Sequence, residues 1–221
     1  MHVRNRSSYV QDEWLDQQII FMNFLAHAFL SFNDAGILTG NMISDFVKGK
    51  KKFDLPENIQ QGILLHRKID TYTDDHLANK ELKLIFRPHY GLYCSPIMDV
   101  LFDHFLACDE NIFSEDSLRQ FTADTYNKLD EYQEHFPERF ARMFPYMKSQ
   151  NWLYHYRSME GVWNSLGGLA RRAKYLGETS TAFALFEDNY ETLRAGYNEF
   201  FPELREMAFS VYQEITGREN V

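Results

Sequence analysis

The chain has 221 residues, of which 44% are hydrophobic and 16% aromatic, so it can bury one large core or two small ones, and low-hydrophobicity disorder is excluded. Its 32 acidic and 23 basic residues give a formal net charge of −9, which argues against non-specific binding to nucleic acid or to anionic membranes. Eleven glycines and six prolines are too few for the many turns of an all-β sandwich.

The two cysteines, Cys94 and Cys108, form no C-x-x-C pair and predict neither a disulfide framework nor a thiolate metal site. No apolar run approaches the roughly 20 residues that span a bilayer. The acidic residues that precede Ile19 argue against a signal peptide. We therefore expect a cytoplasmic protein that neither inserts into a membrane nor binds nucleic acid.

Apolar residues recur at helical spacing from Ile19 to the end of the chain, and no repeat or flexible linker divides it. We predict an all-α, single-domain helical bundle, with residues 1–21 as an N-terminal extension and residues 22–221 as the domain. Glycine and proline mark breaks between the helices, among them Pro88 and Pro202. The predicted helices are, in chain order, 20–33, 38–48, 56–76, 79–86, 96–109, 115–135, 137–147, 158–174, 181–196 and 199–216.

Polar side chains interrupt the first two of these helices at intervals of four residues. In the first helix, Asn23, His27 and Ser31 are four residues apart, so they share one face of an otherwise apolar segment. The second helix repeats this spacing with Asn41 and Asp45. A lone inward histidine is more often a hydrogen-bonded core residue than a metal ligand, so none of these groups identifies a site by itself.

The third and fifth predicted helices also carry ionisable groups at inward positions. His66 and Asp70 lie on the inner face of the third helix, and Asp99, Asp103 and His104 are the only polar residues between positions 97 and 108. A helix so apolar on all sides should be buried. Burying two carboxylates and an imidazole without partners costs several kcal/mol, so either a cation or a buried polar network must compensate them.

Four helices that each direct a histidine or an aspartate inward favour a hard or borderline divalent ion held by nitrogen and oxygen ligands. The sequence has no H-E-x-x-H, G-x-S-x-G, Walker A or G-x-G-x-x-G motif, and no glutamate stands three residues before a histidine, as ferritin-like di-iron sites require. Such a cluster without these motifs suits metal-assisted hydrolysis of a phosphoester.

Several segments, in this order, resemble one known family. They are Met22-Asn-Phe-Leu-Ala-His27, Gly40-Asn-Met-Ile-Ser-Asp45-Phe-Val-Lys-Gly49, Gly62-Ile-Leu-Leu-His66-Arg-Lys-Ile-Asp70, Phe86-Arg87-Pro88, Asp99-Val-Leu-Phe-Asp103-His104, Trp152-Leu153, Tyr156-Arg157 and Arg171-Arg172. The family is that of the acyl carrier protein phosphodiesterases, also called acyl carrier protein hydrolases. The resemblance covers about residues 22–215, which is nearly the whole chain.

Members of this family remove the 4′-phosphopantetheine arm from holo acyl carrier protein, and they resemble distant relatives of the HD metal phosphohydrolases. The resemblance implies a distorted HD-like core and a divalent cation, manganese first, with magnesium or iron(II) as alternatives. It implies attack of a metal-activated water on phosphorus and departure of the carrier-protein serine oxygen. The sequence has no His-Asp dipeptide, which gives the HD superfamily its name, and carries Asp103-His104 in the reverse order.

The resemblance also implies roles for particular residues. Asp45 and Asp99 are the expected catalytic carboxylates, with Asp99 acting as a base or orienting a ligand. Arginine is favoured for binding phosphate oxygens because its guanidinium is a planar donor fork. The expected metal ligands are His27, Asp45, His66, Asp70, Asp103 and His104. The expected substrate-binding residues are Arg67, Arg87, Lys48, Lys50, Lys51, Arg157 and Arg171.

Four lysines lie within five residues, at positions 48 and 50–52, just beyond Asp45. A lysine run alone is usually a solvated loop, but its position beside the expected site favours a docking patch for the acidic carrier protein that the family acts on. Two other functions remain open. One is an HD-like hydrolase of a nucleotide or another small phosphoester, and the other is a non-enzymatic helical binding module with a buried polar network.

Overall fold

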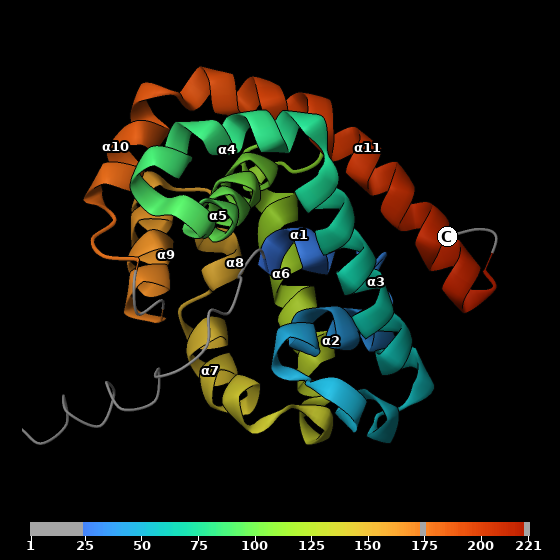
Figure 1. Ribbon diagram of the computed structural model, residues 1–221. Helices are drawn as coiled ribbons and strands as arrows, with labels where there is room; N and C mark the ends of the chain where they lie inside the picture. Colours follow the sequence, from blue (N-terminus) through green and yellow to red (C-terminus); the bar gives the residue numbers. More distant parts are fainter. Residues whose placement is uncertain (1–23, 173–175, 219–221) are drawn as a thin grey trace, which may run out of the picture.

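The computed structural model describes residues 24–172 and 176–218, and within these ranges every regular element is a helix (Figure 1), which confirms the all-α prediction. The predicted extension, residues 1–21, lies outside the described residues. None of the described helices is both long and apolar enough to cross a membrane. In chain order the elements are α1 (Phe24–Phe29), α2 (Ala35–Ile43), the 3-10 helices η1 (Ser44–Phe46) and η2 (Gly49–Asp54), α3 (Glu57–Asp75), α4 (Leu77–Tyr90), the 3-10 helix η3 (Gly91–Tyr93), α5 (Cys94–Ala107), α6 (Glu115–Asp130), the 3-10 helix η4 (Gln133–His135), α7 (Glu138–Ser149), α8 (Trp152–His155), α9 (Met159–Arg172), α10 (Ser180–Asp188) and α11 (Tyr190–Thr216).

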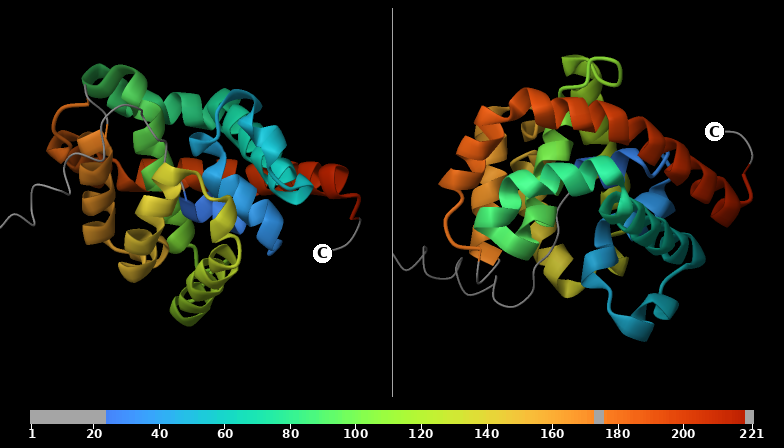
Figure 2. Two further views of the ribbon diagram at one scale, coloured as in Figure 1. Left: turned by 90° about the horizontal axis from the view of Figure 1, so that it is seen from below. Right: turned by 45° about the horizontal axis from the view of Figure 1, so that its top comes forward.

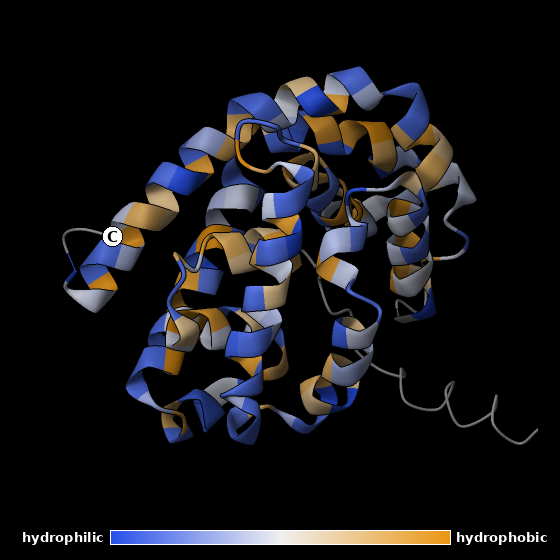
Figure 3. Ribbon diagram, turned by 180° about the vertical axis from the view of Figure 1, so that it is seen from behind, coloured by the Kyte–Doolittle hydropathy of each residue, from blue (hydrophilic) through white to orange (hydrophobic). Residues whose placement is uncertain are grey.

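Helix α5 lies within the core, as its apolar sequence predicts, and it packs against α1, α4 and α9. Phe102 and Phe105 contact the rings of Phe200 and Tyr197 on α11. The outer helices instead show hydrophilic and hydrophobic residues in alternating bands, as Figure 3 shows for α11. This pattern is typical of a helix that buries one stripe and exposes the other.

Helix α1 is much shorter than the predicted helix 20–33. It ends at Phe29, and the chain then reverses through Phe32 and Asn33, whose φ angles are positive. The Asp34 carboxylate accepts hydrogen bonds from the backbone N–H groups of residues 36 and 37, so it caps a second helix that begins three residues earlier than predicted. Two short antiparallel segments therefore replace one long helix and the start of the next.

Helices α2 and α3 approach each other closely enough for their backbones to touch. A Cβ atom on Gly40 would lie 2.0 Å from the carbonyl oxygen of Ile59, and one on Gly62 would lie 2.2 Å from that of Ile37. Such distances are far below van der Waals contact, so both positions require glycine. The close approach brings the polar residues of α2 against those of α3.

The predicted breaks at Pro88 and Pro202 are wrong. Pro88 lies in the last turn of α4, which continues to Tyr90, and Pro202 lies inside the continuous helix α11. A proline removes one backbone hydrogen bond and crowds the preceding turn, but the buried residues Phe201 and Leu204 hold this part of α11 against the core. Helix α11 runs along one side of the molecule against α3 and α4 (Figures 1 and 2).

Candidate metal centre

Four of the predicted ligands lie in one cluster of contacting side chains, from three different elements. They are His27 from α1, Asp45 from η1, and His66 and Asp70 from α3, which are one helical turn apart. The Nε2 atom of His66 lies 3.3 Å from Asp45 Oδ1 and 3.1 Å from Asp70 Oδ2. The Nε2 atom of His27 lies 3.3 Å from Asp70 Oδ1, and the two imidazole rings stack with their centroids 4.0 Å apart.

Asn41 on α2 fixes both histidines. Its Nδ2 donates to the carbonyl oxygen of His27 at 2.9 Å and to Ser31 Oγ at 3.1 Å, and its Oδ1 lies 3.2 Å from His66 Nδ1. Because the amide oxygen is an acceptor, His66 donates through Nδ1, and its Nε2 then faces the carboxylates. The spacing of these polar residues in the sequence therefore corresponds to one buried hydrogen-bond network.

The charges within the cluster are strongly coupled. Burial tends to lower the pKa of His66, but the carboxylates of Asp70 and Asp45 outweigh it and raise this pKa to about 10. Burial tends to raise the pKa of Asp70, but the charge of His66 and the contacts with both histidines together outweigh it and hold this pKa well below its usual range. Burial and the neighbouring His66 lower the pKa of His27. The protein alone thus holds one imidazolium between two carboxylates beside a neutral imidazole.

This arrangement fits a divalent cation. The buried ring nitrogens of His27 have no hydrogen-bond partner among the described residues, although Nε2 faces Asp70. One nitrogen from each histidine and one oxygen of Asp70 lie within 4.8 Å of one another, and Asp45 borders the same space. Two imidazoles and two carboxylates form a donor set suited to manganese, iron(II) or zinc. A cation at this point would give the unpartnered imidazole a ligand role.

The structure does not bring Asp103 into this cluster. Its two carboxylate oxygens accept hydrogen bonds from the backbone N–H groups of Leu25 and Ala26, at 3.0 and 2.8 Å. Burial raises the pKa of Asp103 to about 8, and the hydrogen bonds from α1 and from the side chain of Tyr156 act in the opposite direction. Asp103 thus caps the first turn of α1, and one of the two N–H groups that it accepts from belongs to Ala26, the residue before His27.

His104 and Asp99 also lie outside the four-residue cluster. His104 Nδ1 donates to the carbonyl oxygen of Tyr156 at 2.7 Å, and its Nε2 lies 3.0 Å from the hydroxyl of Tyr190, so both ring nitrogens are engaged. Asp99 borders a very small cavity with Phe102 and other apolar residues. Burial, together with the nearby charge of Asp70, raises the pKa of Asp99 well above its ordinary value.

The expected substrate-binding residues are spread over several surfaces. Lys48, Lys50 and Lys51 are exposed on and just before η2, which begins six residues after the end of α2. Arg157 lies 3.2 Å from Glu115, so it forms an ion pair. The remaining three expected residues are the exposed Arg67 on α3 and Arg87 on α4, and Arg171 on α9, which borders a cleft.

Sequence reasoning alone assigns no functional role to Asn41, which orients His66, or to the glycine pair that brings α2 and α3 together. Asn41 had a visible signal, since it stands four residues before Asp45 in an otherwise apolar segment. The role of Gly62 had no such signal. A glycine inside a helix predicts a close approach only when the partner surface is known.

Comparison with known proteins gives a consistent result. The profile of the family described as acyl carrier protein phosphodiesterase matches residues 22–204. A protein named acyl carrier protein phosphodiesterase from Klebsiella pneumoniae subsp. pneumoniae is 32% identical over 188 residues, which cover 85% of this chain and 97% of the relative. Proteins of the same name from Escherichia coli O6:H1 and Yersinia pestis are each 31% identical, with the same two coverages. No solved structure is significantly similar. The chain belongs to the acyl carrier protein phosphodiesterase family.

Proposed function

We propose that the protein hydrolyses the phosphodiester that joins 4′-phosphopantetheine to a serine of holo acyl carrier protein, and that it uses a divalent cation to do so. The products are apo carrier protein and free 4′-phosphopantetheine. The observation that carries the proposal is the cluster of His27, His66 and Asp70, with Asp45 in contact with His66, in a chain that belongs to a family of phosphodiesterases.

The four side chains would hold the cation on the floor of a site that is open on one side. The side chains of His27 and His66 are 2% and 6% exposed, whereas those of Asp45 and Asp70 are 25% and 42% exposed. The carboxylates thus form the solvent side, where a phosphodiester carried by another protein can enter. A bound divalent cation activates a water molecule and offsets charge on the phosphate oxygens.

Asp45 is the best placed residue to accept a proton from the attacking water. Its Oδ1 faces His66, and its Oδ2 makes no hydrogen bond to any described residue. The Asp45 side chain is partly exposed, so a substrate phosphate can approach it from solvent. Without a cation, the Nε2 atom of His66 contacts the other oxygen of Asp45.

The lysine-rich segment, defined as Lys48 and Lys50–Lys52, provides a docking surface for an acidic carrier protein. Lys48 is only three residues from Asp45, and η2 buries no side chain. Phe53 is 63% exposed. The Nζ atom of Lys52 lies over the Phe53 ring, 4.9 Å from the ring centroid. Exposed cations around one aromatic ring can attract an acidic partner and contact its apolar side chains.

The test is mass spectrometry of holo acyl carrier protein after incubation with the enzyme and Mn²⁺. The wild-type protein should remove the 4′-phosphopantetheine arm and nothing else, and chelation should stop the reaction. Asp70→Asn should lower the rate at least 100-fold, because it removes one charged ligand. Asp74→Asn is the matched control, since Asp74 lies one turn further along α3 and pairs with Lys83 at the surface.

Two results would overturn the proposal. One is a wild-type protein that leaves holo carrier protein intact with Mn²⁺, Mg²⁺ and Fe²⁺ but hydrolyses a compound from a nucleotide panel. The other is an Asp70→Asn variant as active as Asp74→Asn. Circular dichroism of both variants would establish that the helical fold is retained in each case.

A further inference from the structure

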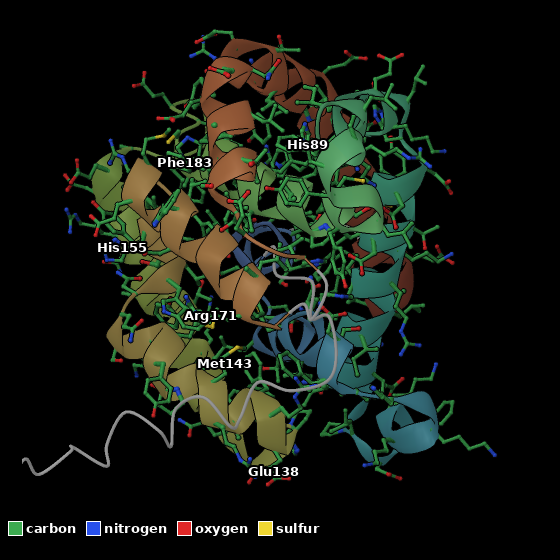
Figure 4. All side chains as sticks on the ribbon, turned by 60° about the vertical axis from the view of Figure 1, so that its left-hand side comes forward. His89, Glu138, Met143, His155, Arg171 and Phe183 are labelled. Carbon is green, nitrogen blue, oxygen red and sulfur yellow. The ribbon has the colours of Figure 1, made fainter. Side chains whose placement is uncertain are left out.

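A cleft of about 470 Å³ lies between α8 and α9, and none of the four cluster residues lines it. This volume falls within the range of pockets that bind small molecules, roughly 300–1,000 Å³. In Figure 4, His155 of α8 lies at the edge of the molecule, and Arg171 of α9 lies nearer to its middle. The lining residues are Gln150, Trp152, His155, Tyr156, Glu160, Gly161, Asn164, Ser165, Gly168 and Arg171.

One face of α9 forms a wall of the cleft. The lining residues from this helix lie at positions 160, 161, 164, 165, 168 and 171, which is the spacing of a single helical face. With a rise of 1.5 Å per residue, this wall is about 16 Å long. A Cβ atom on Gly161 would lie 1.8 Å from the carbonyl oxygen of His155, so glycine lets α9 begin directly against α8. The wall on α9 is therefore long, and its start is held in place by the tight contact with α8.

The middle of the cleft offers neutral hydrogen-bonding groups. Asn164 supplies an amide and Ser165 a hydroxyl, and neither side chain makes a hydrogen bond to another described residue. Gln150 supplies a second amide, whose oxygen accepts from the indole of Trp152 at 2.9 Å. Unpaired amide and hydroxyl groups beside an aromatic ring suit a flexible ligand that carries amides and methyl groups.

A chain of hydrogen bonds runs from the cleft through Asp103 to the first turn of α1, the helix that carries His27. Tyr156, at the floor of the cleft, is hydrogen-bonded by its side chain to Asp103, and its carbonyl oxygen accepts from His104. Asp103 in turn holds the N–H groups of the first turn of α1, one residue before His27. Two adjacent residues of α5 thus fix the floor of the cleft relative to a predicted metal ligand.

We propose that this cleft binds the pantetheine arm of the substrate, an inference that rests on the function proposed above. The arm is a narrow chain with two amides, a hydroxyl and two methyl groups, and it ends in the phosphate that is cleaved. Asn164, Ser165 and Gln150 pair with its amides, and Trp152 packs against its apolar part. The cleft selects the arm, while the lysine-rich segment selects the protein that carries it.

Direct binding of pantetheine, the arm without its phosphate, tests the cleft alone. Isothermal titration should show that wild-type protein binds pantetheine with and without Mn²⁺, because no cluster residue lines the cleft. Asn164→Trp fills the cleft and should weaken this binding at least tenfold. Asn164→Ala removes one hydrogen-bonding group and should weaken it about three- to tenfold. Asn198→Trp, at an exposed position of α11, is the matched control and should bind as the wild type does.

Steady-state kinetics provide the second measurement. Asn164→Ala should raise KM for holo carrier protein about three- to tenfold, while its affinity for Mn²⁺ stays within twofold of the wild-type value. The inference is overturned if Asn164→Trp and Asn198→Trp bind pantetheine equally well, or if wild-type protein does not bind it. Failure of the proposed function has a different signature, since wild-type protein would then release no arm from holo carrier protein.

Discussion

At the residue scale, helical spacing predicts which polar groups point inward but does not predict what each one meets. His27, Asp45, His66 and Asp70 lie together, and the sequence had placed each of them on an inner face. Asp103 had the same sequence signal, yet its two oxygens are engaged by backbone N–H groups of α1, a partner 77 and 78 residues away. Periodicity carries no information about partners so distant in the chain.

Asn41→Leu should weaken Mn²⁺ binding about 10- to 100-fold, the usual effect of removing a group that orients a metal ligand. Leucine has a similar volume, but it cannot accept from His66 or donate to the carbonyl oxygen of His27. Isothermal titration with Mn²⁺ measures the change, and Asn111→Leu, at an exposed turn, is the control. Equal affinities of the two variants would contradict the orienting role of Asn41.

His104→Gln should make protein stability less dependent on pH below pH 7. Burial lowers the pKa of His104 below its ordinary value of 6.5, so the unfolded chain takes up a proton there before the folded protein does. The stability that His104 contributes is fully present above pH 6.5. It decreases as the pH falls from 6.5 towards the lower pKa that His104 has in the folded protein. Glutamine does not titrate, so the slope should decrease by up to about 1.4 kcal/mol per pH unit.

The measurement is urea unfolding of metal-free wild-type and variant protein at several pH values between 5 and 7.5. The other histidines titrate in both proteins, so their contributions cancel in the difference. An unchanged slope would show that His104 binds its proton as readily in the folded as in the unfolded state.

At the element scale, the sequence predicts that helices form but not always where they end. Most long helices were predicted within a few residues, because their apolar stripes extend over several turns. The join between the last two helices was predicted near Pro202 and lies at Asn189, since contacts with the core keep α11 continuous through the proline. Helix α8 and the 3-10 helices η2 and η3 have no counterpart among the predicted helices, because segments of three to six residues are too short to show a period. The segments of η1 and η4 lie within the predicted helices 38–48 and 115–135, which end earlier as α-helices.

Gly62→Ala should lower the free energy of unfolding by about 1–3 kcal/mol, because the new methyl group forces apart two backbones in contact. Gly167→Ala is the matched control, since a Cβ atom there would lie 3.6 Å from Arg171 Nη1, an ordinary contact. Alanine is the better helix former, so the control should be stabilised by about 0.5–1 kcal/mol. Chemical denaturation compares the two variants, and equal stabilities would exclude the close α2–α3 contact.

At the scale of the whole molecule, a net charge of −9 is compatible with an acidic partner only if the positive charges are concentrated near the point of entry. The lysine-rich segment meets this condition, because it begins three residues after Asp45 and none of its side chains is buried. The net charge argues against non-specific nucleic-acid binding, and the proposed docking surface depends on the position of the lysines, three residues and more after Asp45.

Lys50→Glu should lower kcat/KM for holo carrier protein about tenfold at low salt, through slower association of the two proteins. The difference from wild type should shrink towards zero at about 0.5 M salt, where surface charges are screened. Lys80→Glu on α4 makes the same charge change at an exposed ion pair and is the control. Equal effects of both variants would show that overall charge, rather than this segment, governs association.

The six-residue helix α1 has a consequence for the order of folding. A helix this short does not persist alone in water, and its first turn is capped by a residue from α5, far away in the sequence. Contacts between such distant segments form late, since a large loop must close first. His27 therefore reaches its place only after the two ends of that loop have met. Acquisition of Mn²⁺ during refolding should accordingly coincide with the final assembly of the core rather than with formation of the first helices.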